Sequence, residues 1–131
     1  MSRPLPRPTD SELAILRVLW DCGPSTVRQV NEVLAETRTT GYTTTLKLMQ
    51  IMTEKGLVTR DVMSRTHIYS PKWSQERTQR QLVADLVERA FAGSAAALVQ
   101  QALSAKPTSA EDLAEIQKLI ADYKTTGGDD D

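Results

Sequence analysis

The sequence predicts a mostly α-helical fold with a small β-hairpin: a winged helix-turn-helix followed by a C-terminal helical dimerisation region. Two observations lead to this prediction. Within residues 8–72, three segments with apolar residues at helical spacing precede two short runs rich in β-branched and aromatic residues. Within residues 74–124 the helical spacing returns, with apolar stripes broad enough to pack against other helices. We expect these two ranges to be separate domains and residues 125–131, which lack apolar side chains, to be a disordered tail.

The first two helices are predicted from their N-terminal signals. Thr9–Glu12 is a capping box, in which the threonine hydroxyl and the glutamate carboxylate accept hydrogen bonds from backbone N–H groups. Gly23-Pro24 ends the helix that follows it. The second helix is expected to begin near Ser25 or Thr26, both good N-caps, with Gln29 three residues after the threonine.

The third helix and the hairpin complete the first domain. We expect the helix to run from about residue 42 to residue 55 and to stop at Gly56. Residues 57–62 and 66–70 carry the β-branched and aromatic side chains typical of strands, with polar residues between them. A turn at residues 63–65 would join the two strands.

Three amphipathic helices are predicted after Ser74. They are one that runs to Phe91, a short alanine-rich one at 94–103, and one that opens at a second capping box, Thr108–Glu111. Because so short a segment cannot bury three apolar stripes within one subunit, we expect a two-fold homodimer. The residues expected at its interface are Leu82, Val83, Leu86, Val87, Phe91, Leu113, Ile116, Leu119, Ile120 and Tyr123.

The third helix carries the first candidate contacts with DNA. Leu48, Met49 and Met52 fall on one face of this helix and are expected to pack against the first two helices. Thr43, Thr44 and Lys47 then lie on the opposite face near the N-terminal end. Recognition helices present their N-terminal residues to base edges in the major groove. A lysine can donate to guanine, and a threonine offers a hydroxyl and a methyl group. A merely solvated helix face is the alternative interpretation of these three residues.

The hairpin and the start of the second helix favour a role in DNA binding. Arg65 lies at the predicted turn, where a winged helix presents a cation to the DNA backbone, and Arg60 lies on the strand before it. Ser25 and Thr26 are candidates for phosphate binding, because hydroxyls and N–H groups at a helix N-terminus bind anions. Residues 1–80 carry twelve basic and eight acidic side chains, a net charge of +4 within a chain of net charge −1.

Other functional classes find little support in the sequence. With one histidine, His67, the usual hydrolase constellations cannot be built, so we expect no enzyme, no cofactor and no metal site. We expect His67 to be a packed or hydrogen-bonded strand residue. Cys22, the only cysteine, excludes an internal disulfide and is expected to be an inert, partly buried thiol. The absence of a long apolar run and of a secretory signal predicts a soluble cytoplasmic protein.

Four segments carry a resemblance to a known family. Thr9–Trp20, Thr26–Val30, Gly41–Val58 and Arg65–Pro71 are similar to the first helix, second helix, recognition helix and wing of the penicillinase and methicillin-resistance repressors (BlaI/MecI/CopY type). The resemblance implies a homodimeric bacterial repressor, linked to antibiotic resistance, that binds palindromic double-stranded operator DNA. Its recognition helix would be residues 42–55. The candidate DNA-binding residues are then Ser25, Thr26, Tyr42, Thr43, Thr44, Leu46, Lys47, Arg60 and Arg65.

The resemblance also implies a way for repression to end. In that family a membrane-bound sensor metalloprotease pathway leads to a cut in the dimerisation region, at an Asn-Phe bond. Gln101 and Ala102 occupy the similar place in this sequence, so both side chains at the bond have changed. Two other functions remain open: a winged-helix module that binds proteins rather than DNA, and a repressor released by a ligand instead of a protease.

Overall fold

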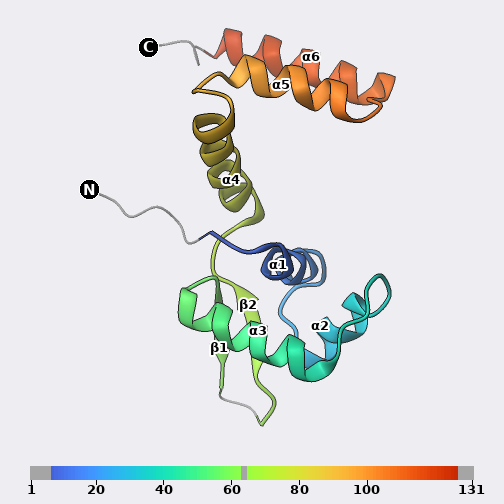
Figure 1. The fold of residues 1–131 in the computed structure, drawn as a ribbon, viewed down its shortest axis with the longest axis vertical. Coiled ribbons are helices and arrows are strands. Elements are labelled where there is room, and N and C mark those ends of the chain that lie inside the picture. The colour runs from blue at the N-terminus through green and yellow to red at the C-terminus, as the bar shows by residue number, and fades with distance from the viewer. Residues whose placement is uncertain (1–6, 63–64, 127–131) are drawn as a thin grey trace, which may run out of the picture. The chain divides into compact units, whose positions relative to one another are not determined.

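The computed structural model describes residues 7–62 and 65–126, which contain six helices and one two-stranded antiparallel hairpin (Figure 1). The fold class predicted from the sequence is confirmed. The chain divides into two compact units, Met1–Asp85 and Leu86–Asp131. The elements are α1 (Asp10–Cys22), α2 (Val27–Leu34), α3 (Tyr42–Lys55), β1 (Val58–Asp61), β2 (Ile68–Pro71), α4 (Gln75–Ala90), α5 (Ala95–Ala105) and α6 (Ala110–Thr125).

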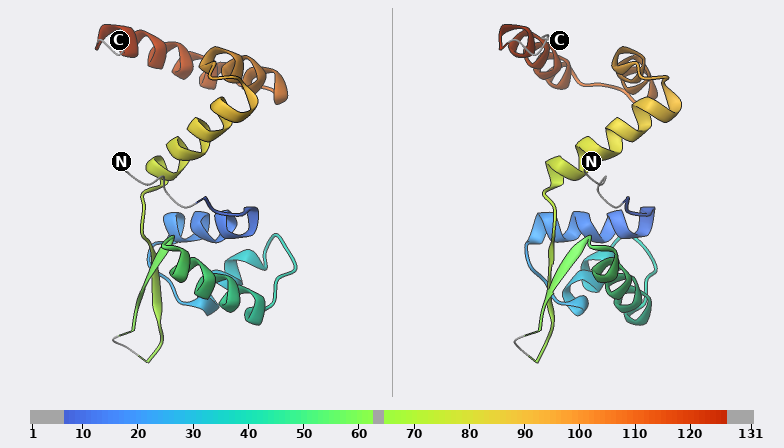
Figure 2. Two further views of the ribbon diagram at one scale, coloured as in Figure 1. Left: turned by 60° about the vertical axis from the view of Figure 1, so that its left-hand side comes forward. Right: turned by 90° about the vertical axis from the view of Figure 1, so that its left-hand side faces the viewer.

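The core of the first unit lies between α1, α2, α3 and the base of the hairpin. Figures 1 and 2 show α1 on one side of α2 and α3, with the hairpin beside them. Tyr69 is the one aromatic residue in a buried cluster otherwise made of aliphatic side chains and methionines. The buried cluster consists of Ile15, Leu16, Val18, Leu19, Val27, Val30, Leu34, Met49, Met52, Leu57, Val58 and Tyr69.

The signals that predicted the first three helices have the expected geometry. The capping boxes at Thr9–Glu12 and Thr26–Gln29 are both formed. Helix α3 has the predicted bounds because Gly56 adopts the left-handed conformation, with φ of 82°, that follows many helix ends. The Leu57 N–H then donates to the Met52 carbonyl over 2.9 Å, which satisfies an acceptor at the end of the helix.

The hairpin is shorter than the sequence predicted. Strand β1 pairs with β2 from Val58↔Pro71 to Asp61↔Ile68, so the ladder includes Pro71 at its end. His67 precedes β2 and is exposed, and the expectation of a packed strand histidine is therefore wrong. Residues 63–64 of the predicted turn lie outside the described residues.

The segment after β2 is fastened to the first unit by two tryptophans. The Trp73 indole N–H donates to the Gly56 carbonyl, and the Trp20 indole N–H donates to the Trp73 carbonyl, each over 3.1 Å. The Arg77 guanidinium lies 4.6 Å from the centroid of the Trp73 ring. These contacts hold the first turns of α4 to the winged helix, and the first compact unit extends to Asp85 inside α4.

The second unit contains the end of α4 with α5 and α6. Helix α6 is preceded by the N-cap Ser109, whose hydroxyl accepts from the Asp112 N–H over 3.0 Å. The capping box expected at Thr108–Glu111 is therefore not formed, because Ser109 is the N-cap and the Thr108 hydroxyl donates to the Lys106 carbonyl instead. Helix α6 ends at Thr125, the first residue of the expected tail, and residues 127–131 lie outside the described part. None of the helices in residues 7–62 and 65–126 is long and apolar enough to cross a bilayer.

Candidate nucleic-acid interface

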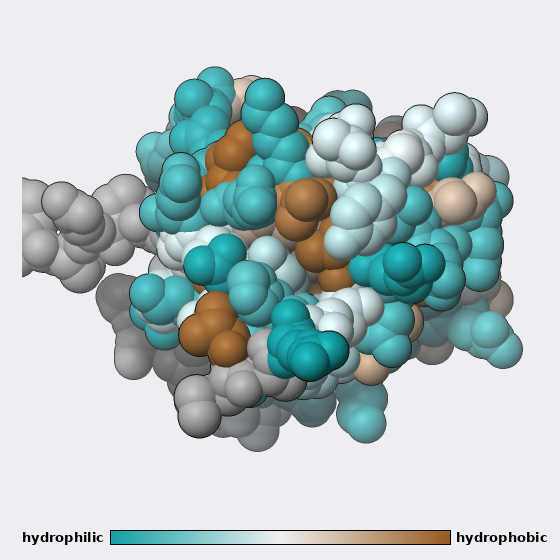
Figure 3. Space-filling model, turned by 90° about the horizontal axis from the view of Figure 1, so that it is seen from below, coloured by the Kyte–Doolittle hydropathy of each residue, from teal (hydrophilic) through white to brown (hydrophobic). Residues whose placement is uncertain are grey.

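A groove of about 600 Å³ lies where the first turns of α2 and α3 meet the chain that returns from the hairpin turn. Figure 3 views the first unit from this end, where hydrophilic residues predominate and a few hydrophobic ones lie between them. The groove is lined by Thr26, Val27, Arg28, Gln29, Tyr42, Leu46, Arg65, Thr66, His67 and Tyr69.

The wing side of this groove is joined to the start of α2 by two backbone hydrogen bonds. The Ser25 N–H donates to the Tyr69 carbonyl over 3.0 Å, and the Tyr69 N–H donates to the Ser25 carbonyl over 2.8 Å. The Tyr69 side chain is 1% exposed within the core. Since this bridge lies one residue before Thr26, it holds the base of the wing opposite the helix N-terminus.

The first turn of α2 is organised by its capping box. The Thr26 hydroxyl accepts from the Gln29 N–H over 3.1 Å, and the Gln29 side-chain carbonyl accepts from the Thr26 N–H over 2.9 Å. Helix geometry leaves the N–H groups of Val27 and Arg28 without intrahelical acceptors. Those donors and the positive end of the helix dipole suit this wall of the groove to a phosphate.

The charge of the groove is positive. Arg28 on α2 and Arg65 on the wing are both exposed, and neither forms an ion pair with another described residue. None of the described lining residues is acidic. Two arginines on facing walls, beside the dipole of α2, therefore form a site for a polyanion.

Helix α3 presents the remaining predicted contacts. Tyr42, which is 48% exposed, and the half-buried Leu46 line the groove. Thr43, Thr44 and Lys47 are exposed on α3 but are not among the lining residues. Their exposure at the N-terminal end of the helix agrees with the face expected from the positions of the methionines.

Two of the predicted contacts lie apart from the groove. Arg60 is exposed on β1 and does not line it. Ser25 is 5% exposed, and its hydroxyl donates to the Gly23 carbonyl over 2.8 Å while its N–H is held by Tyr69. The structure does not support the phosphate contact predicted for Ser25, because the bridge to the wing buries this residue.

Six lining residues were not among the contacts predicted from the sequence: Val27, Arg28, Gln29, Thr66, His67 and Tyr69. Arg28 and Gln29 follow the Thr26 cap, so the argument for an anion at this helix N-terminus already contained the signal for them. His67 was assigned to a strand, and its place in the groove follows only from the late start of β2.

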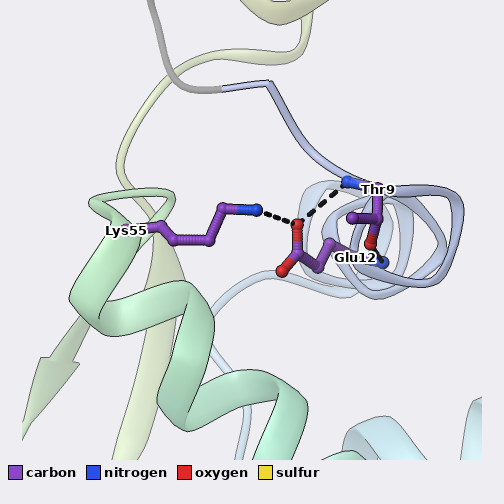
Figure 4. Close-up of polar contacts among 3 residues, drawn as sticks. All are labelled: Thr9, Glu12 and Lys55. Atoms are coloured by element: carbon purple, nitrogen blue, oxygen red, sulfur yellow. Dashed lines mark hydrogen bonds and ion pairs between the residues drawn. The ribbon is translucent and has the colours of Figure 1, made fainter.

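An ion pair between the buried Glu12 carboxylate and the partly exposed Lys55 ammonium joins α1 to the last turn of α3 (Figure 4). The Lys55 ammonium donates to Glu12 Oε1 over 2.7 Å, and the same oxygen accepts from the Thr9 N–H over 2.9 Å. Burial raises the pKa of the Glu12 carboxyl, but the hydrogen bond and charge of Lys55, with the Thr9 contacts, outweigh it and hold the pKa below its ordinary value. The ion pair thus holds the C-terminal end of α3 to α1, whereas the groove lies at the N-terminal end of the same helix.

The residues expected at a dimer interface are apolar and mostly uncovered in the isolated chain. In α4, Val83 is 45% and Leu86 is 48% exposed. In α6, Leu119 and Tyr123 are each 61% exposed. Such exposure on several helices is unusual unless another surface covers them.

The described residues contain no group of three or more His, Cys, Asp or Glu side chains that could hold a metal ion. Cys22 is exposed at the end of α1, so the expectation of a partly buried thiol is wrong. Gln101 and Ala102 are exposed and lie inside α5.

The chain is similar in sequence to a known family and to known proteins. The sequence model of a family described as "Penicillinase repressor" matches residues 8–122. The chain is 34% identical over 87 residues to a protein named "Transcriptional regulator BlaI" from each of two Mycobacterium tuberculosis strains, CDC 1551 / Oshkosh and ATCC 25618 / H37Rv. These alignments cover 66% of this chain and 63% of each relative.

Proposed function

Because the chain belongs to the penicillinase repressor family, we propose that it represses transcription by binding a palindromic operator as a homodimer. The observation that carries this proposal is the groove between α2, α3 and the wing, with Arg28 and Arg65 on opposite walls and no acidic residue among its described lining.

The groove accounts for the contacts that hold the protein on DNA. A backbone phosphate would accept from the N–H groups at the start of α2 and from the Arg28 guanidinium, while Arg65 would contact the backbone beyond the wing. These contacts fix the position of the protein without distinguishing sequences. Because these contacts are between opposite charges, the affinity for DNA falls as the salt concentration rises.

The N-terminal half of α3 would supply the sequence recognition. Thr43, Thr44 and Lys47 are exposed at the end of the helix that enters the major groove in this architecture. Lys47 can donate to guanine O6 and N7, and the threonine methyl groups can contact thymine. Tyr42 and Leu46 line the groove from the same helix.

A homodimer formed through the C-terminal helices would join two such units. A two-fold axis pairs the same apolar stripes of the two chains and presents two recognition helices to two half-sites. Linking the half-sites raises the effective concentration of the second unit once the first is bound, so that two weak contacts give tight binding.

Selection from randomised DNA duplexes tests this proposal. The full-length protein is incubated with duplexes of random sequence, and the bound fraction is amplified and sequenced. We expect an inverted repeat of two short half-sites. A winged helix that binds proteins rather than DNA would enrich no motif, and that result would overturn the proposal.

We propose further that repression ends by cleavage at Gln101–Ala102, downstream of a membrane-bound sensor metalloprotease. A cut there would separate α6 from the apolar stripe at Leu82–Phe91. The protein would then lose the increase in DNA affinity that comes from binding two linked half-sites. Because the bond lies inside α5, the helix must open locally before a protease can act. The Ser94 hydroxyl caps the start of α5 by accepting from the Ala97 N–H over 3.0 Å, so this opening has to overcome the stabilisation by the cap.

Immunoblotting of the chain in induced host cells tests this release. We expect the intact 14.5 kDa chain to disappear as the operator is freed. Derepression with the chain still at full length would contradict cleavage and favour release by a ligand.

A further inference from the structure

We infer that the hydrogen bond between Thr45 and Asn31 sets the rotation of α3 on α2, and thereby the sequence specificity of the proposed DNA contact. Thr45 is fully buried in α3, and its hydroxyl donates to the Asn31 side-chain carbonyl of α2 over 2.8 Å. Among the described side-chain hydrogen bonds, it is the one that joins these two helices.

The apolar contacts between the same helices do not fix a rotation in this way. Val30 and Leu34 of α2 and Met49 and Met52 of α3 all belong to the buried cluster. Apolar burial has no directional preference, and a methionine side chain adapts to small displacements of its neighbours. A buried hydroxyl, by contrast, needs a partner at a narrow distance and angle.

The rotation matters because of the neighbours of Thr45 in the helix. Successive residues of an α-helix are about 100° apart, so holding Thr45 inward directs Thr44 and Lys47 away from the core. Asn31 belongs to the helix whose first turn forms the phosphate-binding wall. The bond therefore fixes the position of the proposed base-contacting residues of α3 relative to the residues of α2 that would bind the DNA backbone. We call Thr45 a positioning residue on this account.

Thr53 provides a matched comparison within the same helix. It is half-buried, and its hydroxyl donates over 2.9 Å to the Met49 carbonyl one turn earlier in α3. This bond stays inside one helix and places no constraint on α2. Thr45→Val and Thr53→Val both remove a threonine hydroxyl while keeping the branched shape, but only the first removes a link between helices.

The inference rests on the proposed function, and its test uses the duplex selected by the wild-type protein. The dissociation constants of the full-length variants are measured for this duplex and for a scrambled one. We expect Thr45→Val to lower the ratio of the two affinities at least about fivefold, the lower end of the effect of one base contact. Binding to the scrambled duplex should be unchanged. Thr45→Ser should restore the ratio, and Thr53→Val should keep it.

Each result decides between the alternatives. A wild-type ratio in Thr45→Val, or an equal loss in Thr53→Val, would overturn the inference while leaving DNA binding intact. Failure of the wild-type protein to bind any duplex would overturn the proposed function and the inference together. If circular dichroism shows that Thr45→Val does not fold, Asn31→Ala removes the acceptor from a half-buried position and carries the same expectation.

Discussion

Replacing Glu12 by glutamine removes the charge that joins α1 to the end of α3, while keeping an acceptor for the Thr9 N–H. The wild-type carboxylate side chain is 4% exposed and lies 2.7 Å from the Lys55 ammonium, which is 33% exposed. A hydrogen bond to a charged group contributes about 1.5–3 kcal/mol. Partial solvation of Lys55 places the loss at about 1–2 kcal/mol. For a domain of this size, that corresponds to a fall in Tm of roughly 5–15 °C.

The effect of Glu12→Gln should depend on pH in a defined direction. Burial raises the pKa of Glu12, but Lys55 and Thr9 outweigh it, so the folded pKa is below the ordinary value of 4.5. A carboxyl with a lowered folded pKa contributes its full stability above the unfolded value and loses it as pH falls through the folded value. The difference between wild type and Glu12→Gln should therefore be full at neutral pH and disappear in acid.

Thermal unfolding followed by circular dichroism at neutral and acidic pH measures both expectations. Asp85→Asn is the matched control, because Asp85 pairs with Arg7 at 3.3 Å with side chains 31% and 49% exposed. Removing that solvated pair should change stability by less than about 1 kcal/mol. A Glu12→Gln protein that melts with the wild type at neutral pH, or that keeps its whole deficit in acid, would refute the reasoning.

Three further predictions concern the interface and the dimer. Lys47→Ala should lower discrimination between the selected and scrambled duplexes by about 1–3 kcal/mol, measured by fluorescence anisotropy; unchanged discrimination would remove Lys47 from base recognition. Arg65→Ala should weaken both complexes about equally and reduce the salt slope by about two, one for each subunit of the proposed homodimer, if the wing contacts phosphates as proposed. An unchanged slope would exclude the wing from the contact. Leu86→Asp places a charge in the expected interface and should sediment as a monomer at micromolar concentration; a persistent dimer would show that the interface lies elsewhere.

Local signals predicted the first three helices well. The capping boxes at Thr9–Glu12 and Thr26–Gln29 involve residues three apart, so their geometry is set by the chain itself. Gly56 likewise ends α3 through its own conformation. The order of these elements and the hairpin was then sufficient to predict the winged-helix class.

The residues that the sequence misplaced or left unassigned depend on contacts between distant segments. Ser25 looked like an available N-cap, but its bridge to Tyr69 across the chain buries it. Thr45 resembles its exposed neighbours in residue type, and only the packing of α3 on α2 makes it a buried donor to Asn31. Polar type alone cannot reveal such burial, because the partner that satisfies the polar group is far away in the sequence.

The salt dependence of binding to the selected duplex tests the central claim most directly. The dissociation constant of the wild-type protein is measured at several salt concentrations, and the logarithm of affinity is plotted against the logarithm of salt concentration. The phosphate contacts proposed for Arg28, Arg65 and the start of α2 in each subunit of a homodimer predict a steep negative slope, since every neutralised phosphate releases counterions. A slope near zero would contradict a DNA interface at this groove.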